Sequence, residues 1–225
     1  MRLAAAQGAG PSHTTIGITD LMTSLAIVFI LLFAAQITKT SSAAQSELQE
    51  NKEDVQTALR DHIRRLGLSL DTDPRDPLAL LIVVPENLLT FEFGRSTLSP
   101  TADQFLLEAL PFYVGALCGP LRDKIDSPAI EGHTDDQGSD AFNLKLSQER
   151  SLAVMVKGLE VIQAHEPFAY QCFQEITSAT GRGRQDLIYE SPAGVNRDKS
   201  RRVIFKIRLR SAEQRHQAER TAKSF

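Results

Sequence analysis

The sequence predicts an α/β sandwich that follows a single N-terminal transmembrane helix. One apolar run of membrane length lies near the N-terminus, at residues 16–37. From residue 78 onward, short apolar and β-branched segments alternate with segments of helical period, a pattern typical of helices packed on a sheet. The 225 residues leave room for about one domain of ordinary size after the helix. A net charge of −3 gives no bulk reason to expect direct binding of nucleic acid.

Residues 16–37 contain no Lys or Arg and would form a helix of ~33 Å, enough to cross a hydrocarbon layer. A cleaved signal peptide is the competing interpretation, but the apolar region is too long for one and Ala34-Ala35-Gln36 is a poor cleavage site. We therefore expect an uncleaved membrane anchor, preceded by a tail at residues 1–15. The flanking charges do not fix the orientation of this anchor by themselves.

Asp20 lies at the threshold of the apolar run, where an ionisable group is costly. An unpaired carboxylate in lipid costs at least about 2.5 kcal/mol, so it usually faces a partner protein or a water-filled path. Asp20 is also suited to cap a helix among the lipid head groups, which is the alternative interpretation. Thr23 and Ser24 share its helical face and would supply polar companions facing a partner protein or a water-filled path. We predict that Asp20, Thr23 and Ser24 form an ion-carrying group.

Residues 38–77 read as a linker. We expect disorder at Ser41-Ser42, followed by a short amphipathic helix over residues 47–66, because apolar residues recur there at helical offsets (Leu48, Val55, Leu59 and Ile63). Pro74 and Pro77 stop any helix, so the domain should begin near residue 78. It would end at residue 210, before a charged tail at residues 211–225.

Within residues 78–210 the pattern predicts strands and helices in alternation. The expected strands are residues 78–84, 88–93, 129–131, 175–179 and 203–209, and the expected helices are residues 100–117 and 144–163. A basic run near the C-terminus alternates with Ile and Val, which favours a solvated strand face over a nucleic-acid patch (Lys199, Arg201, Arg202, Lys206, Arg208 and Arg210).

Two segments carry a family resemblance. Residues 91–100 (FEFGRSTLSP) and 130–150 (IEGHTDDQGSDAFNLKLSQER) resemble the OmpA-like peptidoglycan-binding domain. The resemblance implies a βαβαββ fold in the periplasm and a site for the diaminopimelate of the peptidoglycan stem peptide. It implies that Asp135 and Arg150 hold the ligand, while Phe142, Asn143 and Leu146 shape the pocket. The family's Asn-Arg-Arg-Val motif is stretched here over residues 196–203, which leaves the role of Asn196 open.

The chemistry of Asp135 and Arg150 fits such a ligand. Diaminopimelate carries a carboxylate and an ammonium group on one centre, and the Arg fork matches a carboxylate with two parallel hydrogen bonds. Asp135 follows a predicted strand and Arg150 lies on the next helix, a typical crevice position for α/β ligand sites. An ion pair that only locks the loop to the helix is the alternative.

The N-terminal half resembles a second family. Residues 20–25 (DLMTSL) open the single span, and an OmpA-like domain follows a linker, as in the MotB family of ion-driven stator subunits. The resemblance implies an anchor in a bacterial inner membrane with a cytoplasmic tail at residues 1–15. It also implies a homodimer inside a pentamer of four-span MotA-like partners, with the proton as coupling ion and sodium as the alternative. The short chain and the weakly basic tail favour a non-flagellar member, most like the ZorB subunits that work beside ZorA in Zorya anti-phage defence. A flagellar MotB subunit and a passive OmpA-like or Pal-like wall tether are the alternatives.

No other group of residues suggests chemistry. No nucleophile, base and orienting group can be assembled, so we do not expect an enzyme, and His133 reads as a structural loop residue, not a metal ligand. Cys118 and Cys172 form no metal motif. They could form an intrachain disulfide in an oxidising compartment or remain a free, buried pair, and the sequence leaves both open.

Overall fold

The computed structural model describes residues 13–92, 94–190, 192 and 194–211, and residues 213–215, 217 and 220 of the C-terminal tail, with side chains from Met22 onward. It comprises two units, Met1–Ser46 and Glu47–Phe225, which are considered separately. Helix α1 (His13–Arg65) contributes to both. Within the described part of the chain, it is the one helix long and apolar enough to cross a membrane.

The predicted disorder at Ser41-Ser42 is wrong, because both residues are helical. Residues 18–66 contain neither Gly nor Pro, so nothing in the sequence interrupts the helix. Hydroxyl groups in this part of the chain also form hydrogen bonds with carbonyl oxygens of the same helix. Thr38 Oγ1 donates to the Ala34 carbonyl oxygen (2.6 Å), and Ser42 Oγ donates to that of Lys39 (3.0 Å). A polar composition was therefore a poor indicator of disorder here.

Gly67 ends α1. Its φ of +73° is a left-handed conformation that L side chains rarely adopt, and the Leu68 N–H then donates back to the Ile63 carbonyl oxygen at 3.0 Å.

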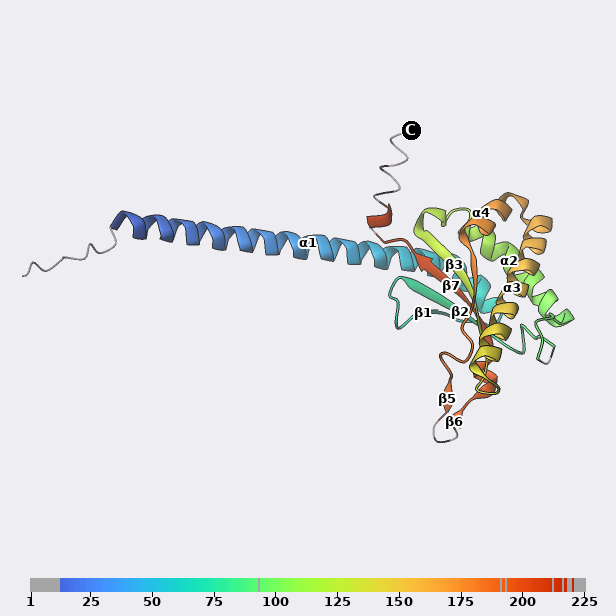
Figure 1. Ribbon diagram of the computed structural model, residues 1–225. Helices are drawn as coiled ribbons and strands as arrows, with labels where there is room; N and C mark the ends of the chain where they lie inside the picture. Colours follow the sequence, from blue (N-terminus) through green and yellow to red (C-terminus); the bar gives the residue numbers. More distant parts are fainter. Residues whose placement is uncertain are drawn as a thin grey trace, which may run out of the picture. The chain divides into compact units, whose positions relative to one another are not determined.

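The second unit is built on a five-stranded sheet with the order β1-β2-β7-β3-β4 (Figure 1). The strands are β1 (Leu70–Thr72), β2 (Ala79–Pro85), β3 (Ile125–His133), β4 (Ser178–Gly181) and β7 (Arg202–Leu209). All neighbours are antiparallel except β3 and β4, which are parallel. The longer helices are α2 (Pro100–Leu117) and α3 (Asp140–His165). The chain order β2-α2-β3-α3-β4-β7 confirms the predicted α/β class and its βαβαββ path.

Smaller elements complete the unit. They are helix α4 (Tyr170–Ile176), the one-turn helix α5 (Arg197–Ser200), the 3₁₀ turns η1 (Arg122–Lys124) and η2 (Pro167–Ala169), and the hairpin β5 (Tyr189–Glu190) with β6 (Gly194–Val195).

The core lies between one face of the sheet and the helices. Alternate residues of β2 and β7 are buried there, as the period of a strand requires, while Lys206 and Arg208 face the other side and pair with Asp73 and Asp126. The C-terminal part of α1 belongs to this core, because Val55, Leu59 and Ile63 are almost fully buried and pack in one cluster with apolar residues of the sheet and of the other helices. The compact unit thus begins well before the predicted residue 78.

Three predicted strands differ from the structure. The strand predicted at residues 129–131 is longer, since β3 runs from Ile125 to His133. In residues 88–93, Phe91 forms only an isolated bridge with Leu98, because the Pro85 carbonyl oxygen accepts from the N–H groups of Leu88 and Leu89 and turns the chain; Phe93 lies outside the described residues. The strand predicted at residues 175–179 begins only at Ser178, because α4 extends to Ile176.

Helix α3 covers the outer edge of β4. Gln148 Nε2 donates to the Ala179 carbonyl oxygen (3.1 Å), and Gln148 Oε1 accepts from the Gly181 N–H (2.7 Å). Two backbone groups of an edge strand are thereby paired with a side chain.

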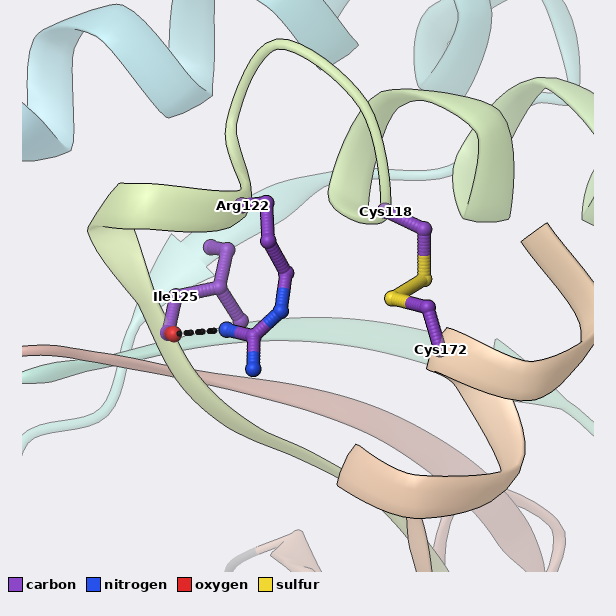
Figure 2. Close-up of a disulfide and its surroundings, with 4 residues drawn as sticks. All are labelled: Cys118, Arg122, Ile125 and Cys172. Atoms are coloured by element: carbon purple, nitrogen blue, oxygen red, sulfur yellow. Dashed lines mark hydrogen bonds between the residues drawn. A yellow bond between two sulfur atoms is a disulfide. The ribbon is translucent and has the colours of Figure 1, made fainter. Parts of the chain in front are cut away.

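Cys118 and Cys172 form an intrachain disulfide, with their Cα atoms 5.9 Å apart (Figure 2). Cys118 is the C-cap of α2 and Cys172 lies in α4. Of the two alternatives that the sequence left open, the structure has the bridge. It ties the segment between α3 and β4 to the end of α2.

Candidate ligand-binding cleft

A cleft of about 500 Å³ lies where β2 and β3 end and α3 begins. It is lined by Glu86, Phe91, Gly94, Thr134, Asp135, Gln137, Gly138, Phe142, Asn143, Leu146, Arg150 and Arg201. All five residues that the OmpA-like resemblance pointed to (Asp135, Phe142, Asn143, Leu146 and Arg150) are among them. The structure therefore brings the predicted site residues together around one cavity.

The loop between β3 and α3 positions Asp135. A side chain at Gly132 would collide with the Ser147 carbonyl oxygen, so glycine lets the end of β3 approach α3 closely. Asp135 Oδ1 accepts from the Gln137 N–H (3.0 Å), which closes a turn, and Asn143 Nδ2 donates to the Gln137 carbonyl oxygen (2.8 Å). Asn143 thus holds the loop in addition to lining the cleft.

Arg150 projects from α3 into the cleft and is only 7% exposed. Its Nε donates to the Arg95 carbonyl oxygen (3.0 Å), and its guanidinium carbon lies 4.8 Å from the centre of the Phe91 ring. Among the described residues, no carboxylate lies within ion-pair distance of it. Burial lowers the pKa of Arg150, against the opposing charge of Glu86. An arginine nevertheless stays protonated, so Arg150 is a buried cation that makes no ion pair with the described residues.

Asp135 pairs with a different arginine. Its Oδ2 accepts from Arg201 Nη1 at 2.8 Å. The alternative in which Asp135 and Arg150 form an ion pair that locks the loop to α3 is therefore wrong.

Arg201 and Glu86 are the charged cleft residues that the sequence analysis missed. Arg201 also pairs with Glu86 and with Asp198. Burial lowers the pKa of Arg201, but the hydrogen bonds that it donates to Glu86 and Asp135 raise it overall. The alternating basic run predicts that Arg201 lies on a solvated strand face, but β7 begins one residue later and Arg201 lines the cleft. The stretched Asn-Arg-Arg-Val motif was the available signal, since it contains Arg201.

The rest of that motif is structural. Asn196 is the N-cap of α5, accepting from the Lys199 N–H at 3.0 Å. Arg202 is buried, and donates to the carbonyl oxygens of Ser200 (3.1 Å) and Asp186 (3.0 Å).

The remaining predicted residues fall elsewhere. Thr23 and Ser24 are exposed on α1, and the side chain of Asp20 lies outside the described residues. His133 is buried at the end of β3 with Nδ1 3.3 Å from the Gln185 carbonyl oxygen, an arrangement that suits a structural residue. In the part of the chain that the structure describes, no three His, Cys, Asp or Glu side chains are grouped to hold a metal ion.

The fold and part of the sequence are similar to known proteins. A putative MotB-like protein from Desulfovibrio vulgaris superposes with a TM-score of 0.53 at 24% identity, covering 74% of this chain and 96% of that one. Outer membrane protein P5 of Haemophilus influenzae is 36% identical over 107 residues, or 44% of this chain. A segment of 88 residues is 36% identical to photosystem I P700 chlorophyll a apoprotein A2 of Gloeobacter violaceus.

These relationships are partial. The chain spans 28% of protein P5 and 9% of the photosystem protein, and no family model matches it. What they support is the fold of the C-terminal domain, a sheet with helices as in the MotB-like protein. The apolar helix that precedes this domain is a feature of the chain itself.

Proposed function

We propose that this chain is a wall-anchored subunit of a stator-type membrane motor, and that its cleft binds the diaminopimelate of peptidoglycan. The buried, unpaired guanidinium of Arg150 is the observation that carries the binding proposal. A buried charge is costly without a partner, and an anionic ligand would supply one.

The cleft suits a ligand that carries both charges. The Nε of Arg150 is engaged by Arg95, so its two terminal nitrogens would donate to the ligand carboxylate. Asp135 would accept from the ammonium group on the same centre, while Phe142 and Leu146 would contact the aliphatic chain of diaminopimelate. This division of roles needs no catalytic group.

Binding to isolated sacculi tests the proposal. Arg150→Ala and Asp135→Ala should each abolish co-sedimentation of the full chain with diaminopimelate-type sacculi, because each leaves one ligand charge unpaired. Arg208→Ala is the matched control, since Arg208 is exposed on the opposite face of the sheet. Undiminished binding by both folded cleft variants would reject the site.

The motor part of the proposal rests on the N-terminal helix. The apolar helix, the Asp20 motif and the MotB-like fold support a subunit that carries protons through Asp20, with Thr23 and Ser24 beside it, inside a ring of multi-span partners. We propose two copies of this chain within five MotA-like subunits, and among such motors the ZorB component of a Zorya anti-phage system, with ZorA as the ring.

Two experiments test the motor. The complex purified in mild detergent should contain a ring of larger membrane subunits around two copies of the chain, as mass measurement would show. Asp20→Asn keeps the size of the side chain but cannot ionise, so phage protection should be lost while expression and assembly persist. Full protection by Asp20→Asn would favour a passive wall tether, and rescue of swimming in a flagellar stator mutant would favour a flagellar subunit.

The disulfide supports the proposed orientation. Disulfides persist in oxidising compartments such as the bacterial periplasm, so the Cys118–Cys172 bridge favours a periplasmic domain and a cytoplasmic N-terminus. Alkaline phosphatase fused to the C-terminus should then be active in cells, because that enzyme matures only outside the cytoplasm. Activity confined to an N-terminal fusion would reverse the orientation.

A further inference from the structure

The one-turn helix α5 brings two arginines onto two neighbouring carboxylates of the cleft loop. Arg197 Nε donates to Asp136 at 2.7 Å, and Arg201 Nη1 donates to Asp135 at 2.8 Å. The two arginines are four residues apart, which is the spacing that places side chains on the same side of a helical turn. Of these two ion pairs, the one made by Arg201 lies within the cleft.

The pair between Arg201 and Asp135 occupies the group that a ligand ammonium would need. Asp135 Oδ2 already accepts from Arg201, and Oδ1 accepts from the Gln137 N–H. A second positive charge brought to Asp135 is repelled by the guanidinium. Arg150 can therefore pair with a ligand carboxylate directly, whereas a ligand cation can pair with Asp135 only if Arg201 moves away from it.

Arg201 has two other carboxylates to hold it. Its Nε donates to Glu86 and its Nη2 donates to Asp198. Asp198 is 90% exposed and does not line the cleft, whereas Glu86, the residue that follows β2, does line it. The guanidinium can therefore release Asp135 without becoming an unpaired buried charge.

We propose that Arg201 is a specificity-determining residue that competes with the ligand ammonium for Asp135, with Glu86 and Asp198 holding Arg201 once it is displaced. This inference rests on the proposed peptidoglycan function. In it, a ligand must bring both its carboxylate and its ammonium group to open the pair, since a carboxylate at Arg150 alone leaves Arg201 on Asp135. The cleft thereby distinguishes an amino acid centre from a simple acid.

Calorimetric titration of the full chain in detergent tests this with two probes. Meso-diaminopimelate carries both charged groups, and pimelate has the same carbon chain and carboxylates but no ammonium. Arg201→Gln removes the competing charge, so it should bind diaminopimelate about threefold to tenfold more tightly, the range expected for losing a partly exposed ion pair. Binding of pimelate should not become tighter.

Two further variants separate this role from others. Arg197→Gln breaks the neighbouring pair with Asp136 outside the cleft and should leave both affinities unchanged. Asp198→Asn acts on the cleft only through Arg201, and should weaken diaminopimelate binding by about twofold because Arg201 is then held more tightly by Asp135. If Arg201→Gln fails to fold, as judged by its thermal transition, Asp198→Asn carries the test.

Each outcome decides between the possibilities. Weaker binding of both probes by Arg201→Gln would make Arg201 a direct contact of the ligand carboxylate and overturn the inference, as would unchanged binding of diaminopimelate. Tighter binding of both probes would mean that Arg201 only obstructs the cleft, which also overturns it. If the unmutated chain binds diaminopimelate and Arg150→Gln does not, the proposed function stands whatever Arg201 does. Absence of binding by the unmutated chain would reject both.

Discussion

Removing the disulfide should lower the stability of the C-terminal unit substantially. Cys118 and Cys172 are 54 positions apart, so the bridge closes a large loop in the unfolded chain. The chain-entropy relation gives about 4 kcal/mol for a loop of that length at 25 °C, and measured values for natural disulfides commonly fall at about 2–4 kcal/mol. Both cysteines are only partly buried, so replacing them by alanine removes little packing in addition.

The double variant Cys118→Ala, Cys172→Ala avoids leaving a reactive thiol. A loss of about 2–4 kcal/mol corresponds to a melting temperature about 4–16 °C lower for a unit of this size. Circular dichroism of the full chain in detergent would follow the unfolding, and mass spectrometry after alkylation would confirm the bridge in the starting material. Reduction of the unmutated chain should reproduce the shift. An unchanged melting temperature in a chain with a verified bridge would refute the loop-closure reasoning.

Three further predictions concern the same unit. Leu59→Ala should cost about 2–5 kcal/mol of unfolding free energy in chemical denaturation, because Leu59 is fully buried; a loss under 0.5 kcal/mol would show that this part of α1 does not belong to the core. Gly132→Ala should cost at least about 1–3 kcal/mol and weaken sacculus binding, since its side chain would strike the Ser147 backbone; normal melting and binding would contradict that tight approach. Burial raises the pKa of Asp73, but its hydrogen bond with Lys206 lowers this pKa overall. The stabilisation that ionised Asp73 gives the folded state should therefore be complete above about pH 4 and be lost as the pH falls further. Asp73→Asn should then flatten the decline of stability in acid, and an equally steep decline in both proteins would exclude this pair as its source.

The sequence predicted the elements that have a clear period and clear boundaries. Helix α2 was expected at its observed bounds, because Pro100 begins it and apolar residues recur at helical offsets up to residue 117. The sequence could not predict that the chain turns after Pro85 instead of forming a strand from residue 88, since that depends on the Pro85 carbonyl oxygen accepting two N–H groups. The burial of Val55 and Leu59 was likewise hidden, because an amphipathic pattern does not name the surface that covers its apolar face.

The sequence likewise predicted one part of the candidate site and missed another. The residues that line the cleft from one continuous segment, Asp135 to Arg150, were found together because their motif is local. Arg201 was missed because its partner is 66 positions away, and because a basic residue next to an alternating strand reads as part of that strand. The partner of Asp135 is therefore evident only in the folded structure, where the ends of β2 and β3 and the start of β7 lie together.

The hydrogen bonds from Gln148 to β4 protect this edge strand from pairing with other molecules. An edge strand with free backbone groups can recruit a strand from another molecule, which leads to aggregation or domain swapping. The side chain of Gln148 occupies the outward groups of Ala179 and Gly181 and leaves them unable to pair with a second chain. Copies of this domain at high local concentration would then stay separate folded units, and Gln148→Ala would be expected to turn that edge into a point of self-association.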